Sequence, residues 1–169
     1  MTASLPFVFR RFAPELASGI TTLGNPASGA APDLGALVGL NGLYDLPDLV
    51  YGLGTSREHL SGVYKDLLAH AFGSEEGQWP IASPARIHPT QLQERLQRRE
   101  VSKLVLLDQS AEDQLVPLNQ ADKMEAALKQ ADGLLVVRGN RCKGTHAAPW
   151  EEGEIIWNTI QDVLALLAK

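Results

Sequence analysis

The chain has little cysteine and no long apolar run. Cys142 is the single cysteine among 169 residues, so no disulfide can form within the chain. Disulfides mark oxidising compartments, and nothing in the sequence points to one. No apolar stretch approaches the roughly 20 residues that a membrane-spanning helix needs. We therefore predict a cytoplasmic protein without a membrane partner.

Positive charge is also scarce, since 15 Lys and Arg face 20 Asp and Glu and leave a formal net charge of -5. Nucleic acids and anionic membranes bind cationic surfaces, so neither is an expected partner. A small-molecule or protein partner is the better expectation. Hydrophobic residues at 44% and charged residues at 21% are ordinary for a globular protein with one core.

The first 35 residues do not read as part of that core. Pro6 interrupts a short apolar run, and Arg10 and Arg11 follow it, which reverses the order of a signal peptide. The next stretch is rich in Gly, Pro, Ala and Ser and has no hydrophobic period. We predict a poorly structured segment over residues 1–35 and a folded domain over residues 36–169.

The last third of the chain alternates strand and helix patterns. Short aliphatic runs at residues 36–40, 103–107 and 134–137 predict buried strands, and residues 117–131 and 151–169 predict helices. This alternation is typical of parallel strands joined by crossover helices. The expected fold class is α/β, with at least three parallel strands and flanking helices.

The middle of the chain is less regular. Residues 57–71 predict an amphipathic helix ending at Gly73, while residues 73–92 have no clear pattern and residues 91–99 predict a short, charged, exposed helix. The apolar face expected for the first helix consists of Leu60, Val63, Tyr64, Leu67, Leu68 and Ala71.

Titratable residues follow two of the predicted strands. Asp108, Glu112 and Asp113 follow the strand at residues 103–107, and His146 follows the next strand. Active sites of open parallel sheets lie beyond the carboxyl ends of the strands. An acid that orients a histidine, which in turn moves a proton, is the acid–base part of a catalytic triad.

The surrounding residues resemble the α/β-hydrolases. The stretch SAEDQLVPLNQADKMEAAL resembles the acid segment of that superfamily, and GTHAAPWEEGEIIWNTIQDVLALL resembles its histidine loop and last helix. The resemblance implies that Asp113 is the acid and His146 the base. More narrowly, VGLNGLYDLPDLV, WPIASPARI, AEDQLVP and GTHAAPW together resemble fungal kynurenine formamidases, which hydrolyse N-formylkynurenine to kynurenine and formate. This resemblance covers residues 36–169.

The sequence departs from the family at the nucleophile. No G-x-S-x-G elbow occurs in the chain, and the early strands and the oxyanion-hole glycine motif are missing. We expect a partial α/β-hydrolase fold that begins after the elbow, with residues 1–12 as a remnant of the following helix. Ser28 is the nearest imitation of the nucleophile, but no strand precedes it. The chain alone is expected to lack substantial activity.

A partial sheet leaves an unpaired strand edge and uncovered apolar helix faces. We therefore expect association with a second copy, as a homodimer, or with another chain. The alternatives to a formamidase are a related esterase and a non-catalytic interaction module or pseudoenzyme that kept the half-fold.

Asn41, Tyr44 and Asp45 follow the first predicted strand and either line a substrate pocket or form a turn. We assign substrate binding to Asn41 and Tyr44. Cys142 lies on the loop of the expected base and is not expected to be a nucleophile.

No cofactor or metal is expected. The other histidines have no partner at metal-ligand spacing and are interpreted as surface or helix residues; they are His59, His70 and His88. Trp150 and Trp157 are interpreted as helix-packing residues.

Overall fold

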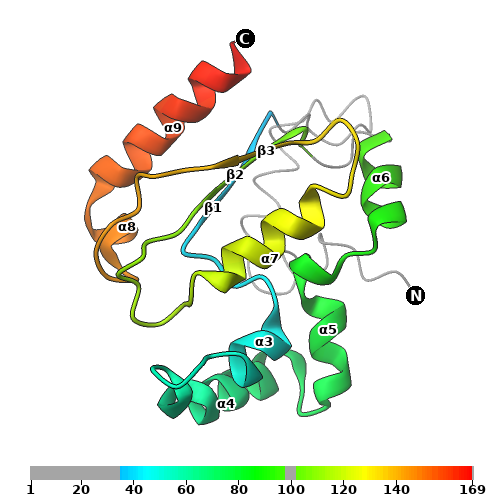
Figure 1. Ribbon diagram of the computed structural model, residues 1–169, viewed down its shortest axis with the longest axis vertical. Helices are drawn as coiled ribbons and strands as arrows, with labels where there is room; N and C mark the ends of the chain where they lie inside the picture. The colour runs from blue at the N-terminus through cyan, green and yellow to red at the C-terminus, as the bar shows by residue number, and fades with distance from the viewer. Residues whose placement is uncertain (1–34, 98–101, 169) are drawn as a thin grey trace, which may run out of the picture.

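A computed structural model describes residues 35–97 and 102–168, and its centre is a parallel three-stranded sheet. The strands are β1 (Leu37–Leu40), β2 (Leu104–Asp108) and β3 (Leu135–Arg138), in the spatial order β1-β2-β3 (Figure 1). Each pairing is parallel, with Val38 opposite Leu106 and Leu106 opposite Val137. The predicted α/β class and parallel strands are confirmed, with strand bounds shifted by at most one residue. The prediction that all three strands are buried is wrong for the edge strands β1 and β3, where Leu37, Val38 and Leu135 are exposed because, of the described strands, only β2 has a neighbour on each side.

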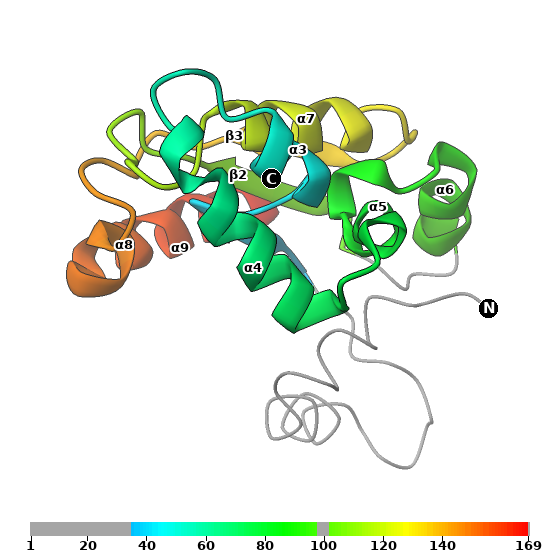
Figure 2. The same ribbon diagram turned by 90° about the horizontal axis from the view of Figure 1, so that it is seen from below.

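Helices cover both faces of this sheet (Figure 2). Val105 and Leu107 point to one face, where they pack with α7 (Asn119–Leu128) and α6 (Pro89–Gln97). The alternate side chains of β2 point to the other face and pack with α9 (Gly153–Leu167). All five residues of β2 are buried, as a strand covered on both faces requires.

A separate group of helices extends from the carboxyl end of β1 (Figure 1). It consists of α3 (Leu46–Tyr51), α4 (Ser61–Phe72) and α5 (Trp79–Ala82). Leu49, Leu68 and Trp79 form the centre of its own apolar cluster. Helix α4 ends at Gly73, whose φ of 92° suits glycine at a helix terminus.

Two predictions for the middle of the chain need correction. The helix expected over residues 57–71 begins with a 3₁₀ turn at Glu58–Leu60, and Val63 and Leu67 on its expected apolar face are exposed. The charged helix expected to be exposed, α6, buries Leu92 and Leu96 in the core. These two leucines are four residues apart and therefore share one helix face.

The stretch predicted to be irregular, residues 73–92, consists of short elements rather than one long loop. Besides α5 it contains the 3₁₀ helices Glu76–Gln78 and Pro84–Arg86. Pro80 lies in the first turn of α5, and Pro84 begins the second 3₁₀ helix. At these positions the missing N–H of proline costs no hydrogen bond.

The helix predicted over residues 151–169 is confirmed as α9, and a short helix, α8 (Ala148–Glu151), precedes it, separated by the non-helical residue Glu152. Trp150 and Trp157 are 61% and 60% exposed, so their interpretation as packing residues is wrong. Trp157 belongs to an exposed row on α9, here called the α9 stripe, which consists of Trp157, Ile160, Leu164 and Leu167.

The predicted segment 1–35 lies almost entirely outside the described residues, as do Ser28 and the expected helix remnant. Within the described part of the chain, no helix combines the length and apolar character that a membrane crossing requires.

Candidate active site

The loops that follow the three strands meet at the carboxyl edge of the sheet, and Asn41 joins them. Its main-chain N–H donates to the carbonyl of Asp108 at 3.0 Å. Its side-chain Oδ1 accepts from the N–H of Ser110 at 2.9 Å, and its Nδ2 donates to the carbonyl of His146 at 3.2 Å. The φ of Asn41 is 47°, a left-handed conformation that asparagine tolerates better than most residues.

Asp113 and His146 lie side by side in this region. The imidazole Nδ1 of His146 is 2.9 Å from Oδ2 of Asp113. The two residues come from different loops, one after β2 and the other after β3. The structure therefore brings together the acid and the histidine that the sequence pattern and the resemblance pair.

The Asp113 carboxylate is buried and held by several donors. Its Oδ1 accepts from the main-chain N–H groups of Leu115 and Val116, both at 2.8 Å. Its Oδ2 accepts from Nε2 of Gln109 at 3.0 Å in addition to the imidazole. Asp113 is only 1% exposed, so these donors replace water and fix the direction of the carboxylate.

His146 is oriented through its main chain as well as its ring. Its N–H donates to Oε1 of Gln114 at 3.0 Å, and its carbonyl accepts from Asn41. An ionised carboxylate can only accept hydrogen bonds. Nδ1 of His146 is therefore the protonated ring nitrogen, and it donates to Oδ2 of Asp113. The lone pair is then on Nε2. The side chain is 30% exposed, which leaves the ring accessible to a reacting group.

The other two acids of the same loop have different surroundings. Asp108 is buried, and its Oδ2 accepts from the main-chain N–H groups of Arg141 at 2.7 Å and Cys142 at 3.2 Å. Its role is to hold the loop after β3. Glu112 is exposed. Of the three acids, Asp113 is the one that contacts His146.

Tyr44 and Asp45 are parts of the scaffold. The Tyr44 side chain packs in the core against the sheet, and burial raises its pKa to about 12. Asp45 accepts from the N–H of Asp48 at the start of α3 and pairs with Arg86 at 2.9 Å. The buried Oε1 of Gln120 accepts from the N–H groups of both Tyr44 and Asp45. Substrate binding by Asn41 or Tyr44 stays a prediction.

These contacts also join two of the segments on which the formamidase resemblance rests. The N–H of Leu46 donates to Oγ of Ser83 at 2.9 Å, and the N–H of Ala85 donates to the carbonyl of Tyr44 at 2.9 Å. Together with the Asp45–Arg86 ion pair, they bind the GLYDL and SPAR segments to each other. These contacts give the side chains of Asp45, Ser83 and Arg86 a structural role.

Cys142 is buried, and its surroundings keep the thiol protonated. Desolvation, followed by the charges of Asp108 and Asp113, raises the pKa of Cys142 to about 12. A nucleophilic cysteine needs the opposite shift. Within residues 35–97 and 102–168, no serine, threonine or cysteine side chain forms a hydrogen bond with the His146 ring.

The remaining histidines are exposed, in agreement with their interpretation as surface or helix residues; they are His59, His70 and His88. His70 contacts the carbonyl of Asp66 through Nδ1 at 2.7 Å. In the described ranges no three His, Cys, Asp or Glu side chains gather as metal ligands would.

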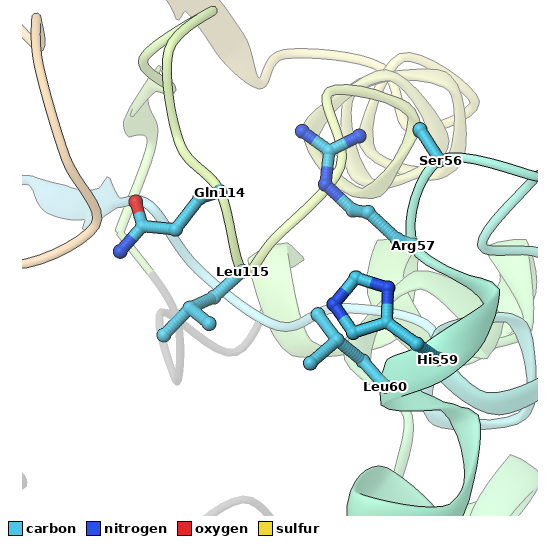
Figure 3. Close-up of a pocket in the computed structure, with 6 residues that line it drawn as sticks. All are labelled: Ser56, Arg57, His59, Leu60, Gln114 and Leu115. Carbon is cyan, nitrogen blue, oxygen red and sulfur yellow. The ribbon is translucent and has the colours of Figure 1, made fainter.

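A pocket of about 350 Å³ lies beside the Asp113 loop (Figure 3). Figure 3 shows one wall from the segment before α4 and the facing wall from the loop that follows Asp113. The lining residues are Ser56, Arg57, His59, Leu60, Gln114 and Leu115. Nη2 of Arg57 donates to the main-chain carbonyl of Asp113 at 2.6 Å, so the pocket borders the loop that carries Asp113, although neither Asp113 nor His146 lines it.

Sequence reasoning missed Gln109, Gln114 and Arg57. Gln109 follows Asp108 and Gln114 follows Asp113, two acids that were considered as site residues. A glutamine side chain alone does not indicate a role until its hydrogen-bond partner is known. Arg57 is 56 residues from Asp113 in the sequence, and only the fold brings the two together.

No protein-family model, no curated protein and no solved structure matches the chain.

Proposed function

We propose that Asp113 and His146 are the acid and the base of a hydrolase that cleaves a small amide or ester. The observation that carries the proposal is the 2.9 Å hydrogen bond between a part-exposed imidazole and a buried, fully oriented carboxylate. Such a carboxylate fixes the imidazole tautomer and stabilises the imidazolium that forms during proton transfer. Within residues 35–97 and 102–168, Nε2 of His146 has no hydrogen-bond partner, and the side chain is 30% exposed, which suits a group that exchanges a proton with a substrate.

The proposed reaction follows the acyl-transfer scheme. Nε2 of His146 takes the proton of a serine hydroxyl while the oxygen forms a bond to the substrate carbonyl carbon. The imidazolium returns the proton to the leaving amine or alcohol as the carbonyl–heteroatom bond breaks. Water then releases the acyl group by the same route. Asp113 stays ionised throughout and orients His146.

The serine of this scheme comes from outside the described residues, either elsewhere in the chain or in another polypeptide. The chain contains no G-x-S-x-G elbow, so we keep the prediction that it has no substantial activity alone. The assay uses a nitrophenyl ester and N-formylkynurenine. Turnover by the 169-residue chain that disappears in His146→Ala would overturn the prediction of inactivity.

The substrate we propose is N-formylkynurenine, and a related ester is the alternative. The support is the resemblance of four segments to fungal kynurenine formamidases. Two of these segments serve the scaffold, so they support the enzyme class more strongly than the identity of the substrate. A cytoplasmic location is part of the same proposal.

Labelling by a fluorophosphonate tests the proposed machinery directly. This probe reacts with serines that a neighbouring base activates. We expect it to label a serine in the source-cell polypeptide that contains His146, or in its stable partner, and we expect labelling to be lost in His146→Ala. Absence of a labelled serine, or labelling that persists in the variant, would refute the proposal.

A second candidate is an interaction module that does no chemistry. The observation in its favour is the α9 stripe, where Trp157 and Leu164 are exposed by 60% and 54%. Contiguous apolar surface of this kind marks sites of protein association. The labelling experiment separates the candidates, because a binding module needs no reactive serine.

A further inference from the structure

Arg57 occupies an unusual position for a charged side chain. Its Nη2 donates to the carbonyl of Asp113, whereas its Nε is buried and has no hydrogen-bond partner in the described part of the chain. Within the same residues Arg57 forms no ion pair, although ion pairs hold Arg86, Arg138 and Arg141. The buried Nε itself is closed to a ligand, so a ligand in the pocket would bind the guanidinium through its remaining N–H groups.

The pocket around Arg57 is an open hollow on the surface, of a size that could hold a small molecule. Its volume of about 350 Å³ falls within the usual range of ligand pockets, roughly 300–1,000 Å³. Leu60 and Leu115 supply apolar walls, and Gln114 and His59 supply polar groups (Figure 3). An apolar body with one anionic group would match these walls and the charge of Arg57. Guanidinium groups bind carboxylates through two parallel hydrogen bonds.

Both walls are connected to the Asp113–His146 pair. Arg57 binds the main-chain carbonyl of Asp113, and Gln114 accepts the main-chain N–H of His146 at 3.0 Å. A ligand in the pocket would therefore contact two residues that bond to the main chain of the acid and of the histidine. The negative charge of Asp113 does not repel it strongly, because four hydrogen bonds already engage that carboxylate.

We infer that this pocket binds the carboxylate of a small acylated amino acid or aryl acid, with Arg57 as the residue that recognises the charge. That the bound molecule is the substrate rests on the proposed function; that the pocket prefers a carboxylate does not. Arg57 then selects, among amides and esters, those that carry a carboxylate beside an apolar group.

Two stable probes that differ only in charge test the inference. N-acetylphenylalanine carries a carboxylate, and N-acetylphenylalaninamide replaces it with a neutral amide. Kd is measured by NMR titration of the 169-residue chain, and the shifted signals identify the site. We expect the carboxylate to bind about 10-fold or more tightly than the amide, a ratio that one charge-assisted hydrogen bond supplies. The shifts should map to Leu60, Gln114 and Leu115.

Variants separate the charge of Arg57 from its structural role. In Arg57→Gln the preference for the carboxylate should disappear, whereas Arg57→Lys should keep part of it. Arg95→Gln removes an arginine from the distant helix α6 and should change nothing. Absence of binding by either probe, equal binding of both, or a preference that survives in Arg57→Gln would overturn the inference.

Failure of this inference is distinguishable from failure of the proposed function. Binding needs no nucleophile, so carboxylate preference is measured whether or not the protein turns over a substrate. Loss of the preference would leave the serine labelling that depends on His146 unaffected. Absence of that labelling would leave the pocket and its preference in place.

Discussion

The side-chain amide of Asn41 donates a hydrogen bond to the main-chain carbonyl of His146, 105 residues later in the sequence. The same amide accepts from Ser110, which follows β2. One residue at the end of β1 thus fixes the loops that carry both members of the Asp113–His146 pair. The φ of Asn41 is positive, so the backbone at this position also favours asparagine or glycine over most other residues.

Substitution of Asn41 should destabilise the protein through these two hydrogen bonds. Asn41→Gly keeps the left-handed backbone and removes both bonds, so we expect the free energy of unfolding to fall by about 1–3 kcal/mol. Asn41→Asp keeps the acceptor for Ser110 but buries a carboxylate against the His146 carbonyl, so it should cost at least as much. Urea denaturation measures both. The exposed Asn140→Gly gives the cost of a glycine alone, and an equal loss in that control would contradict the account.

Replacement of the acid by its amide should reverse the imidazole tautomer. In Asp113→Asn, Leu115 and Val116 still bind the carbonyl oxygen, so the amide nitrogen takes the place of Oδ2 and donates toward His146. His146 must then accept at Nδ1 and carry its proton on Nε2, where it cannot act as a base. Nitrogen NMR of the ring detects the change. The exposed Asp132→Asn should have no effect, and an unchanged ring in Asp113→Asn would refute the assignment.

Stability should fall at alkaline pH because two buried acids resist ionisation. Burial raises the pKa of Tyr44 and of Cys142 to about 12, from ordinary values of about 10 and 8.5. Above pH 9 the folded chain therefore holds protons that the unfolded chain releases, and the free energy of unfolding decreases as pH rises toward 12. Urea midpoints between pH 7 and 11 measure the slope. Tyr44→Phe and Cys142→Ala should each flatten it; an unchanged slope in both would contradict the shifts.

The α9 stripe should mediate self-association. Four exposed apolar residues on one helix face favour burial against a second copy, and we expect a dimer in sedimentation velocity. Leu164→Lys should shift the equilibrium toward monomer. Ala165→Lys adds the same charge at an exposed position off the stripe and should leave the dimer intact. A monomer at every concentration would contradict the prediction.

The strands and the acid–base pair could be predicted because their signals are local. The run LVLL of β2 is aliphatic throughout, as a buried parallel strand requires, and LVV begins β3; strand order then places the following loops at one edge. Asp113 and His146 belong to those loops. Their contact follows from topology plus the choice of one acid among three, which the family resemblance supplied.

The residues that hold the pair could not be predicted, because their partners are distant in sequence or are main-chain groups. Gln114 bonds to the N–H of His146, and Arg57 bonds to the carbonyl of Asp113. Neither hydrogen bond produces a residue spacing or a hydrophobic periodicity that could be recognised in the sequence. The same limit applies to α6, where a charged composition concealed the burial of Leu92 and Leu96.

The central claim is that His146 is the base of a hydrolase, and the turnover of N-formylkynurenine by the source-cell polypeptide that contains His146 tests it most directly. His146→Ala should lower kcat/KM by about 10²–10⁴-fold, the usual contribution of a general base. His88→Ala removes an exposed histidine and should retain full turnover. Equal turnover in the two variants, or no turnover of any amide or ester by the unaltered polypeptide, would contradict the account.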